Sequence, residues 1–167
     1  MVPPAARLPR PGHYSTRDLM ENIIQEGCKM PVQSFQIAVS TRGHRDVVDL
    51  TPRLRDVVRE SGVSDGIAVI FAPGSTAAVT TIEFEPGLRK DIELFLDRLA
   101  PYNAPYQHHE TWHDDNGSSH LQAALIGPSL TVPLVEGSPV LGTWQQAVLI
   151  DCDTRPRKRT VTIQILS

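Results

Sequence analysis

Several features that define whole classes of protein are scarce or missing in this 167-residue chain. It has two cysteines, Cys28 and Cys152, which are far apart and form no CxxC pair, so we expect free thiols in a reducing compartment rather than a disulfide. No apolar run approaches the ~20 residues that a membrane-spanning helix needs. The formal net charge of -3 gives no electrostatic case for nucleic acid or an anionic membrane as a partner. We therefore expect a cytoplasmic protein that binds neither.

The first 31 residues show no core-like pattern. Prolines interrupt residues 1–14, and Arg7 and Arg10 are not followed by the apolar segment of a secretory signal. Ser15 to Cys28 fits a short helix. We predict an N-terminal extension over residues 1–31, partly flexible, and one domain over residues 32–167, long enough to bury a hydrophobic core.

Short strands outnumber helices in the rest of the chain, which predicts an α+β domain on a largely antiparallel sheet. Strands are expected at 34–40, 46–50, 66–72, 79–84, 129–135, 143–152 and 159–166. The 66–72 run is almost wholly apolar, as in a strand buried on both faces. Residues 119–126 fit a helical turn or a strand equally well.

Two helices are better marked. Thr51 is expected to cap the first, with Pro52 at its first position and Gly62 at its end. In the second, from Gly87 to Leu99, apolar residues at helical spacing predict a buried stripe. The stripe consists of Leu88, Ile92, Phe95 and Leu99.

Four of the six histidines fall between positions 108 and 120, in a polar, loop-like segment. Imidazole binds transition metals and transfers protons near neutral pH. The connection between His108 and His120 could let both rings meet at one metal, although surface or hydrogen-bonded histidines explain the pattern as well, since no HExxH or Cys2His2 spacing is present. His109 and His113 are expected to be exposed loop residues without a role.

A second candidate is the turn Gly74-Ser75-Thr76, which follows an apolar strand. Glycine lets backbone N–H groups face an anion, and the two hydroxyls add donors. The turn therefore predicts a phosphate or carboxylate cradle, and an ordinary strand-to-strand turn is the alternative.

A basic cluster near the C-terminus is the third candidate. In a strand, Arg155, Arg157 and Arg159 would point to one face, where three guanidinium groups could hold a diphosphate. A charged sheet edge that discourages edge pairing is the alternative, and Pro156 fits it.

Three further residues carry weaker expectations. Trp144 is expected to pack in a core or a subunit contact. Gln145, beside it, could reach a ligand. Glu83, at the end of a strand, is a candidate base or ligand, with an exposed strand end as the competing explanation.

The motifs together resemble a known family. Tyr106-x-His108, Asn116-Gly-x-Ser-His120, Leu125-Ile-Gly-Pro-Ser129, Gly142-Thr-Trp-Gln145 and Arg155-Pro-Arg-x-Arg159 occur here in the order in which similar motifs occur in the YjbQ family. Members of that family are often called secondary thiamine-phosphate synthases. The resemblance covers roughly residues 32–166, and Pro73-Gly-Ser-Thr-Ala-Ala78 is similar to one branch of the family.

The resemblance implies a compact α+β domain, a homotrimer with pockets near subunit boundaries, and a polar or metal-binding pocket that contains His108 and His120. The implied reaction joins a pyrimidine diphosphate to a thiazole phosphate in thiamine biosynthesis. Its implied catalytic residues are His108, His120 and Glu83, with a divalent metal, Mg or Zn, held by the two histidines. The implied substrate-binding residues are Gly74, Ser75, Thr76, Asn116, Gln145, Arg155, Arg157 and Arg159.

One departure from the family pattern concerns the metal. Much of the family has histidine where this chain has Gly74, and asparagine where it has Ile82. The alternative to the enzyme is therefore a non-catalytic trimer that binds a small anionic metabolite or a divalent metal.

Overall fold

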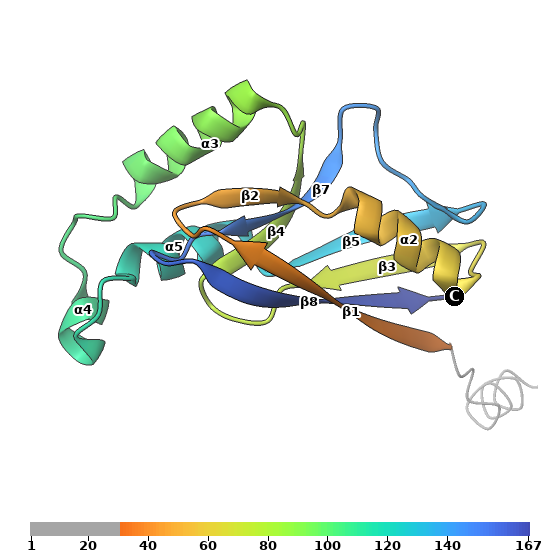
Figure 1. Ribbon diagram of the computed structural model, residues 1–167, viewed down its shortest axis with the longest axis horizontal. Coiled ribbons are helices and arrows are strands. Elements are labelled where there is room, and N and C mark those ends of the chain that lie inside the picture. Colours follow the sequence, from red (N-terminus) through yellow and green to blue (C-terminus); the bar gives the residue numbers. More distant parts are fainter. Residues whose placement is uncertain (1–30) are drawn as a thin grey trace, which may run out of the picture. The chain divides into compact units, whose positions relative to one another are not determined.

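The computed structural model describes residues 31–167, and Figure 1 shows their course. The predicted helix between Ser15 and Cys28 lies outside the described residues. The described part begins with β1 (Val32–Thr41), β2 (Asp46–Asp49), α2 (Thr51–Ser61), β3 (Gly66–Phe71) and β4 (Ala77–Ile82). It continues with α3 (Pro86–Leu99), α4 (Gln107–Trp112), α5 (Gly117–Ile126), β5 (Ser129–Val135), β6 (Ser138–Pro139), β7 (Gln146–Asp151) and β8 (Arg157–Leu166).

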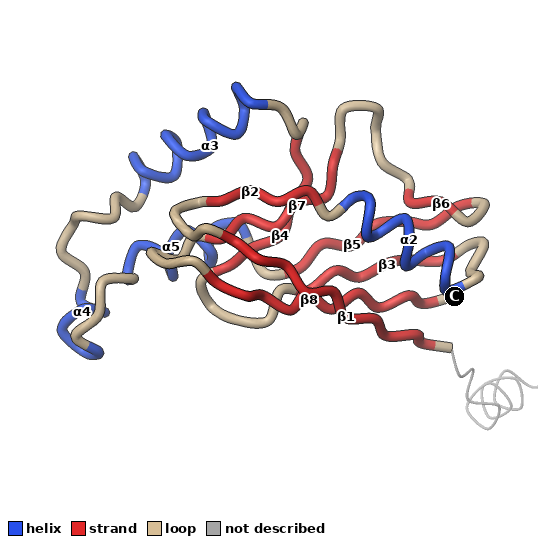
Figure 2. Tube along the Cα trace, in the orientation of Figure 1, coloured by secondary structure: helices blue, strands red, loops and turns tan. Residues whose placement is uncertain are grey.

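Within residues 31–167 the strands form two sheets in which every pairing is antiparallel. The larger sheet has the order β1-β8-β3-β5-β6, and the smaller has β2-β7-β4. Figure 2 shows these strands as the body of the molecule, with α3, α4 and α5 toward one end. The α+β class with antiparallel sheets is confirmed.

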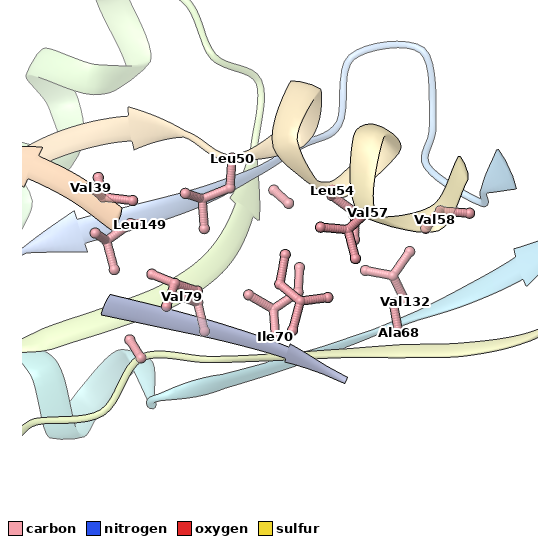
Figure 3. Close-up of a cluster of buried hydrophobic side chains, with 14 of the residues drawn as sticks. Val39, Leu50, Leu54, Val57, Val58, Ala68, Ile70, Val79, Val132 and Leu149 are labelled. Carbon is pink, nitrogen blue, oxygen red and sulfur yellow. The ribbon is translucent and has the colours of Figure 1, made fainter. Parts of the chain in front are cut away.

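The main core lies between the sheets and beneath α2. Leu54 and Val58 of α2 are buried, and they belong to one cluster with Ile70 of β3, Leu149 of β7 and Ile163 of β8. Figure 3 shows Leu54, Val57 and Val58 pointing down from the helix toward Val132 and Ala68. Burying a leucine or isoleucine side chain contributes about 1.5–3 kcal/mol, so this cluster accounts for much of the domain's stability.

The helix α2 begins differently from the prediction. Leu50 occupies the N-cap position, and the Thr51 hydroxyl bonds to β7 instead, where it accepts a hydrogen bond from the Ala147 N–H at 3.0 Å. Gly62 ends the helix as predicted, with φ +67° in the left-handed region.

Two predictions of burial are wrong for a single chain. β3 alternates instead of being buried on both faces: Ala68 and Ile70 are buried, while Phe71 is 42% exposed. On α3 only Leu96 is buried, and Phe95 is 57% exposed. Apolar spacing identifies the residues that share a face, but the chain itself does not cover these faces.

The segment from 107 to 126, expected to be mostly a loop, contains two helices. Residues 107–112 form α4, and residues 117–126 form α5, which decides between helix and strand for that stretch. Among residues 31–167, no helix combines the length and apolar character needed to cross a membrane.

Candidate functional site

The helices α4 and α5 bring His108 and His120 together. Their ring centroids lie 4.4 Å apart, and the rings are tilted by 52°. The His108 side chain is 29% exposed, so the pair is half-buried and open to solvent on one side. The two rings are therefore direct neighbours.

Asp114 and Asn116, from the turn between the two helices, complete the surroundings of His108. Asp114 Oδ2 lies 3.5 Å from His108 Nε2. With its amide nitrogen turned toward these groups, Asn116 donates to His108 Nε2 at 3.2 Å and to Asp114 Oδ2 at 3.1 Å. The predicted residue Asn116 therefore contacts His108 directly.

The electrostatics of the pair favour a neutral imidazole at His120. Burial, and next to it the neighbouring His108, lower the pKa of His120 below its ordinary 6.5, against the opposite influence of Asp114 and Asp153. A neutral imidazole keeps a nitrogen lone pair that can accept a proton or bind a metal.

His120 shares a cavity with the turn at Gly74. The cavity has a volume of about 380 Å³, and we call it the His120 cavity. It is lined by Gly74, Ser75, Ala77, His120, Leu121, Ala123, Ala124 and Pro128. Two predicted substrate-binding residues, Gly74 and Ser75, are therefore brought to one of the two predicted catalytic histidines.

Thr76, the third residue of that turn, belongs instead to a buried polar cluster. Its hydroxyl donates to Asp153 Oδ2 at 3.0 Å and accepts from Arg159 Nη2 at 2.9 Å. Arg159 also makes two hydrogen bonds to Asp151, from Nε at 2.9 Å and from Nη2 at 2.6 Å. Thr41 donates to Asp151 as well. We call these five residues the Asp151 cluster.

The three arginines do not present one common face. Arg155 precedes β8, is 69% exposed and lies 3.8 Å from Asp115. Arg157 is paired with Asp153 at 2.9 Å, and the Arg159 side chain is only 12% exposed. The strand geometry predicted for all three is wrong, because the strand begins only at Arg157.

Gln145, Glu83 and Trp144 lie apart from the His120 cavity. Gln145 bonds within its own neighbourhood, donating to Thr81 Oγ1 at 2.9 Å and accepting from the Gly142 N–H at 3.1 Å. Glu83 is exposed beyond the end of β4, before the helix cap Glu85. Trp144 is 72% exposed, which excludes the core within this chain and leaves a subunit contact as its expected role.

Sequence reasoning misjudged His109. It is half-buried, and its Nε2 accepts a hydrogen bond from the Gly117 N–H at 3.1 Å. The prediction that it is an exposed loop residue is wrong. The only sequence signal was Gly117, which permits a close approach of the two helices.

Asp151 and Asp153 were also missed. They alternate on either side of Cys152, just before the basic segment, and this pattern of acids facing arginines could have indicated a paired cluster. Cys152 itself is buried, and burial raises the pKa of its thiol to about 12, which makes it a poor nucleophile.

Comparisons with known proteins identify the family of this chain. Residues 35–167 match the family described as UPF0047 protein YjbQ-like. The chain belongs to the UPF0047/YjbQ family. A UPF0047 protein of Methanocaldococcus jannaschii is 36% identical over 133 residues, which is 79% of this chain and 93% of that protein. A UPF0047 protein of Mycobacterium tuberculosis strain H37Rv is 37% identical over 123 residues, which is 73% of this chain and 90% of the relative.

Solved structures of the UPF0047/YjbQ family have the same fold. A YbjQ-like protein of unknown function from Sulfolobus solfataricus P2 superposes with a TM-score of 0.78 at 35% identity, covering 83% of this chain and 99% of the other. A hypothetical protein from Aeropyrum pernix K1 gives a TM-score of 0.76 at 32% identity, covering 81% and 98%. The family resemblance read from the motifs is thus confirmed.

Proposed function

We propose that this UPF0047/YjbQ protein is a thiamine-phosphate synthase-like transferase. In the reaction, the thiazole nitrogen attacks the methylene carbon of the pyrimidine diphosphate, the carbon–oxygen bond breaks, and pyrophosphate leaves with the electron pair. The observation that supports this proposal best is the His108–His120 pair beside a cavity that also contains Gly74 and Ser75. Stabilising the leaving oxyanion is the main catalytic task.

A divalent metal fits this pair only in part. Two imidazole nitrogens suit Zn better than Mg, which prefers oxygen ligands. Within residues 31–167, no group of three or more His, Cys, Asp or Glu side chains lies close enough to hold a metal ion. A bound metal would take its remaining ligands from water, substrate or another subunit. When bound, it would supply Lewis-acid stabilisation of the diphosphate.

Arg159 supplies positive charge next to the cavity. Its Nε and Nη2 are committed to the Asp151 cluster, whereas Nη1 lies 3.6 Å from the position of a Cβ built on Gly74. Because glycine carries no side chain, no Cβ lies between the turn and this nitrogen at the position where much of the family has histidine. This departure supports an anion, rather than a third metal-binding histidine, at position 74.

The direct test is turnover. Purified protein is incubated with a pyrimidine diphosphate, a thiazole phosphate and either Mg²⁺ or Zn²⁺, and thiamine phosphate is measured. We expect product from the wild type, loss of at least tenfold in His120→Ala, and little change in the exposed His113→Ala. Turnover that is equal in wild type and His120→Ala would contradict the proposal.

The second candidate is a non-catalytic protein that binds a small anion or a metal. The partial metal-binding set and the glycine at position 74 favour it. It predicts an increase in melting temperature with phosphate compounds or Zn²⁺, without any product. No stabilisation by either class of ligand would exclude it.

Both candidates include a homotrimer. Large apolar side chains are exposed on α3, α5 and β3, among them Phe95, Leu121 and Phe71. Leu121 also lines the His120 cavity, so a subunit packed on α5 would border that cavity. Light scattering should give three times the mass of one chain, and Phe95→Asp should lower it. A wild-type mass equal to one chain would refute the trimer.

A further inference from the structure

The contact between His109 and Gly117 joins α4 to α5. Besides the 3.1 Å hydrogen bond from the Gly117 N–H to His109 Nε2, the two helices approach very closely there. A Cβ built on Gly117 would lie 2.7 Å from Tyr106 Cβ and 3.0 Å from His109 Nε2. The contact therefore requires glycine at 117 and an acceptor at 109.

The hydrogen bond also satisfies a helix terminus. The first N–H groups of a helix have no partner within it. Asn116, the N-cap residue of α5, makes no side-chain capping bond, and the imidazole of His109 takes that place for Gly117. The Tyr106 ring stacks edge-on against His109, with centroids 5.3 Å apart, which fixes the orientation of the imidazole.

Apart from the His109–Gly117 contact, α4 is held mainly by the contacts of His108 with Asp114 and Asn116. None of its residues is buried, and its principal packing within residues 31–167 is against α5. Its C-cap residue, His113, is exposed and adopts a left-handed conformation. The contact of Tyr106 and His109 with Gly117 therefore acts together with the contacts of His108 with Asp114 and Asn116 in setting where His108 is held.

We propose that His109 is a positioning residue: its imidazole, through Nε2, ties α4 to the first turn of α5 and thereby helps to place His108 beside His120. This inference rests on the proposed function, because the proposed function is what gives the His108–His120 pair a role. It assigns His109 no contact with substrate or metal. Two consecutive histidines then have different roles: His108 binds the ligand, and His109 holds α4 against α5.

The decisive experiment measures the ring geometry without substrate. In full-length, isotopically labelled protein, an NOE between the ring protons of His108 and His120 reports the 4.4 Å separation. We expect the cross-peak in the wild type and its loss in His109→Leu, which has no acceptor. His109→Gln should restore it, because the amide oxygen can reach the Gly117 N–H. The matched control is His113→Leu, which should keep the cross-peak.

A second readout is the affinity for Zn²⁺ by calorimetry. His109→Leu should weaken binding by about tenfold or more, the size of effect that groups supporting a ligand have, whereas His109→Gln should stay near wild type. The glutamine variant removes an imidazole yet keeps the acceptor, so it separates positioning from direct ligation.

The outcomes distinguish this inference from the proposed function. A cross-peak that persists in His109→Leu, or that is lost in both 109 variants while the sheet resonances stay unchanged, overturns the positioning role. If the cross-peak follows the expected pattern but no variant binds Zn²⁺, the positioning role stands and the metal proposal fails.

Discussion

The Asp151 cluster and the His108–His120 pair are both polar, but they use their hydrogen-bonding capacity differently. In the cluster, Asp151 is fully buried and accepts two hydrogen bonds from Arg159 and one from Thr41. Thr41, Asp151 and Arg159 lie on β1, β7 and β8, and the other two members of the cluster lie in the connections next to β4 and β7. The two histidines lie on short helices and are half-exposed, and His108 Nε2 contacts Asn116 and Asp114.

This difference indicates that the Asp151 cluster stabilises the fold, whereas the histidine pair is arranged to bind a ligand. A buried charge must be paired, so the capacity of Asp151 is already spent within the fold. The histidine pair is oriented by its neighbours yet left incomplete, which is the condition for taking up a ligand. Arg159 belongs to both regions, because two of its nitrogens serve the cluster and the third lies next to Gly74.

The largest expected effect comes from removing the centre of the cluster. Asp151→Ala leaves the Arg159 guanidinium buried without its main partner, and we expect a loss of about 3–5 kcal/mol in the free energy of unfolding. Urea denaturation measures it. His120→Ala, at a half-exposed position, should cost less than about 1 kcal/mol by the same measurement. Equal losses at the two positions would remove the distinction between cluster and pair.

The acid dependence of Asp153 tests the same cluster. Burial acts to raise the pKa of Asp153, but hydrogen bonds from Arg157 and Thr76 and the positive charge of both arginines bring it below its ordinary 3.8. Its contribution to stability is thus present above pH 3.8 and is lost as the pH falls through the lowered value. We expect Asp153→Asn to cost about 1.5–3 kcal/mol at pH 7.

The difference between wild type and Asp153→Asn should shrink when urea denaturation is repeated at progressively lower pH, once the wild-type carboxyl is protonated. A gap that stays constant down to the acid limit of folding would show that the charge of Asp153 is not what the cluster uses.

Secondary structure could be predicted from the sequence more reliably than burial, because burial depends on which other element covers a side chain. The strand at 129–135 and the Gly62 end of α2 were predicted with their observed bounds, because both follow from local alternation and turn chemistry. Phe95 and Leu99 were predicted to be buried and are exposed. Their spacing reports a shared face, whereas the element that covers the face is not encoded locally.

The site was predictable to a different extent. The residues alone suggested His108 and His120 as the pair, with surface or hydrogen-bonded histidines as the alternative, and the family motifs added the expectation of a polar or metal-binding pocket. His109 could not be recognised, because its role comes from a close approach of two helices at Gly117. The prediction that three arginines share one face of a strand is wrong because β8 begins only after Arg155 and Pro156. Pro156 indicates a boundary nearby, but not its exact position.

A smaller effect is expected where α4 meets α5. Gly117→Ala introduces a Cβ that would lie 2.7 Å from Tyr106 Cβ, so the helices must separate. We expect a loss of about 1–3 kcal/mol in urea denaturation, as for other overpacked positions. The control is Gly142→Ala, where the nearest side-chain atoms would be 3.7 Å away and the change should stay within about 0.5 kcal/mol. Indistinguishable results for the two glycines would argue against the close helix contact.

The smallest effect concerns the charge state of the pair itself. In metal-free protein, NMR titration should place the pKa of His120 below 6.5, mainly because of burial and next because of His108. Folding therefore favours the neutral ring, and the stability that this gives is present above pH 6.5 and is lost as the pH falls through the lowered value. His108→Ala should move the pKa of His120 upward but not to 6.5, since burial remains, while His113→Ala should leave it unchanged. If the pKa of His120 were the same with and without His108, the two rings would not be in contact in solution. The pair would then differ from the Asp151 cluster in having no fixed geometry, and not only in being half-exposed.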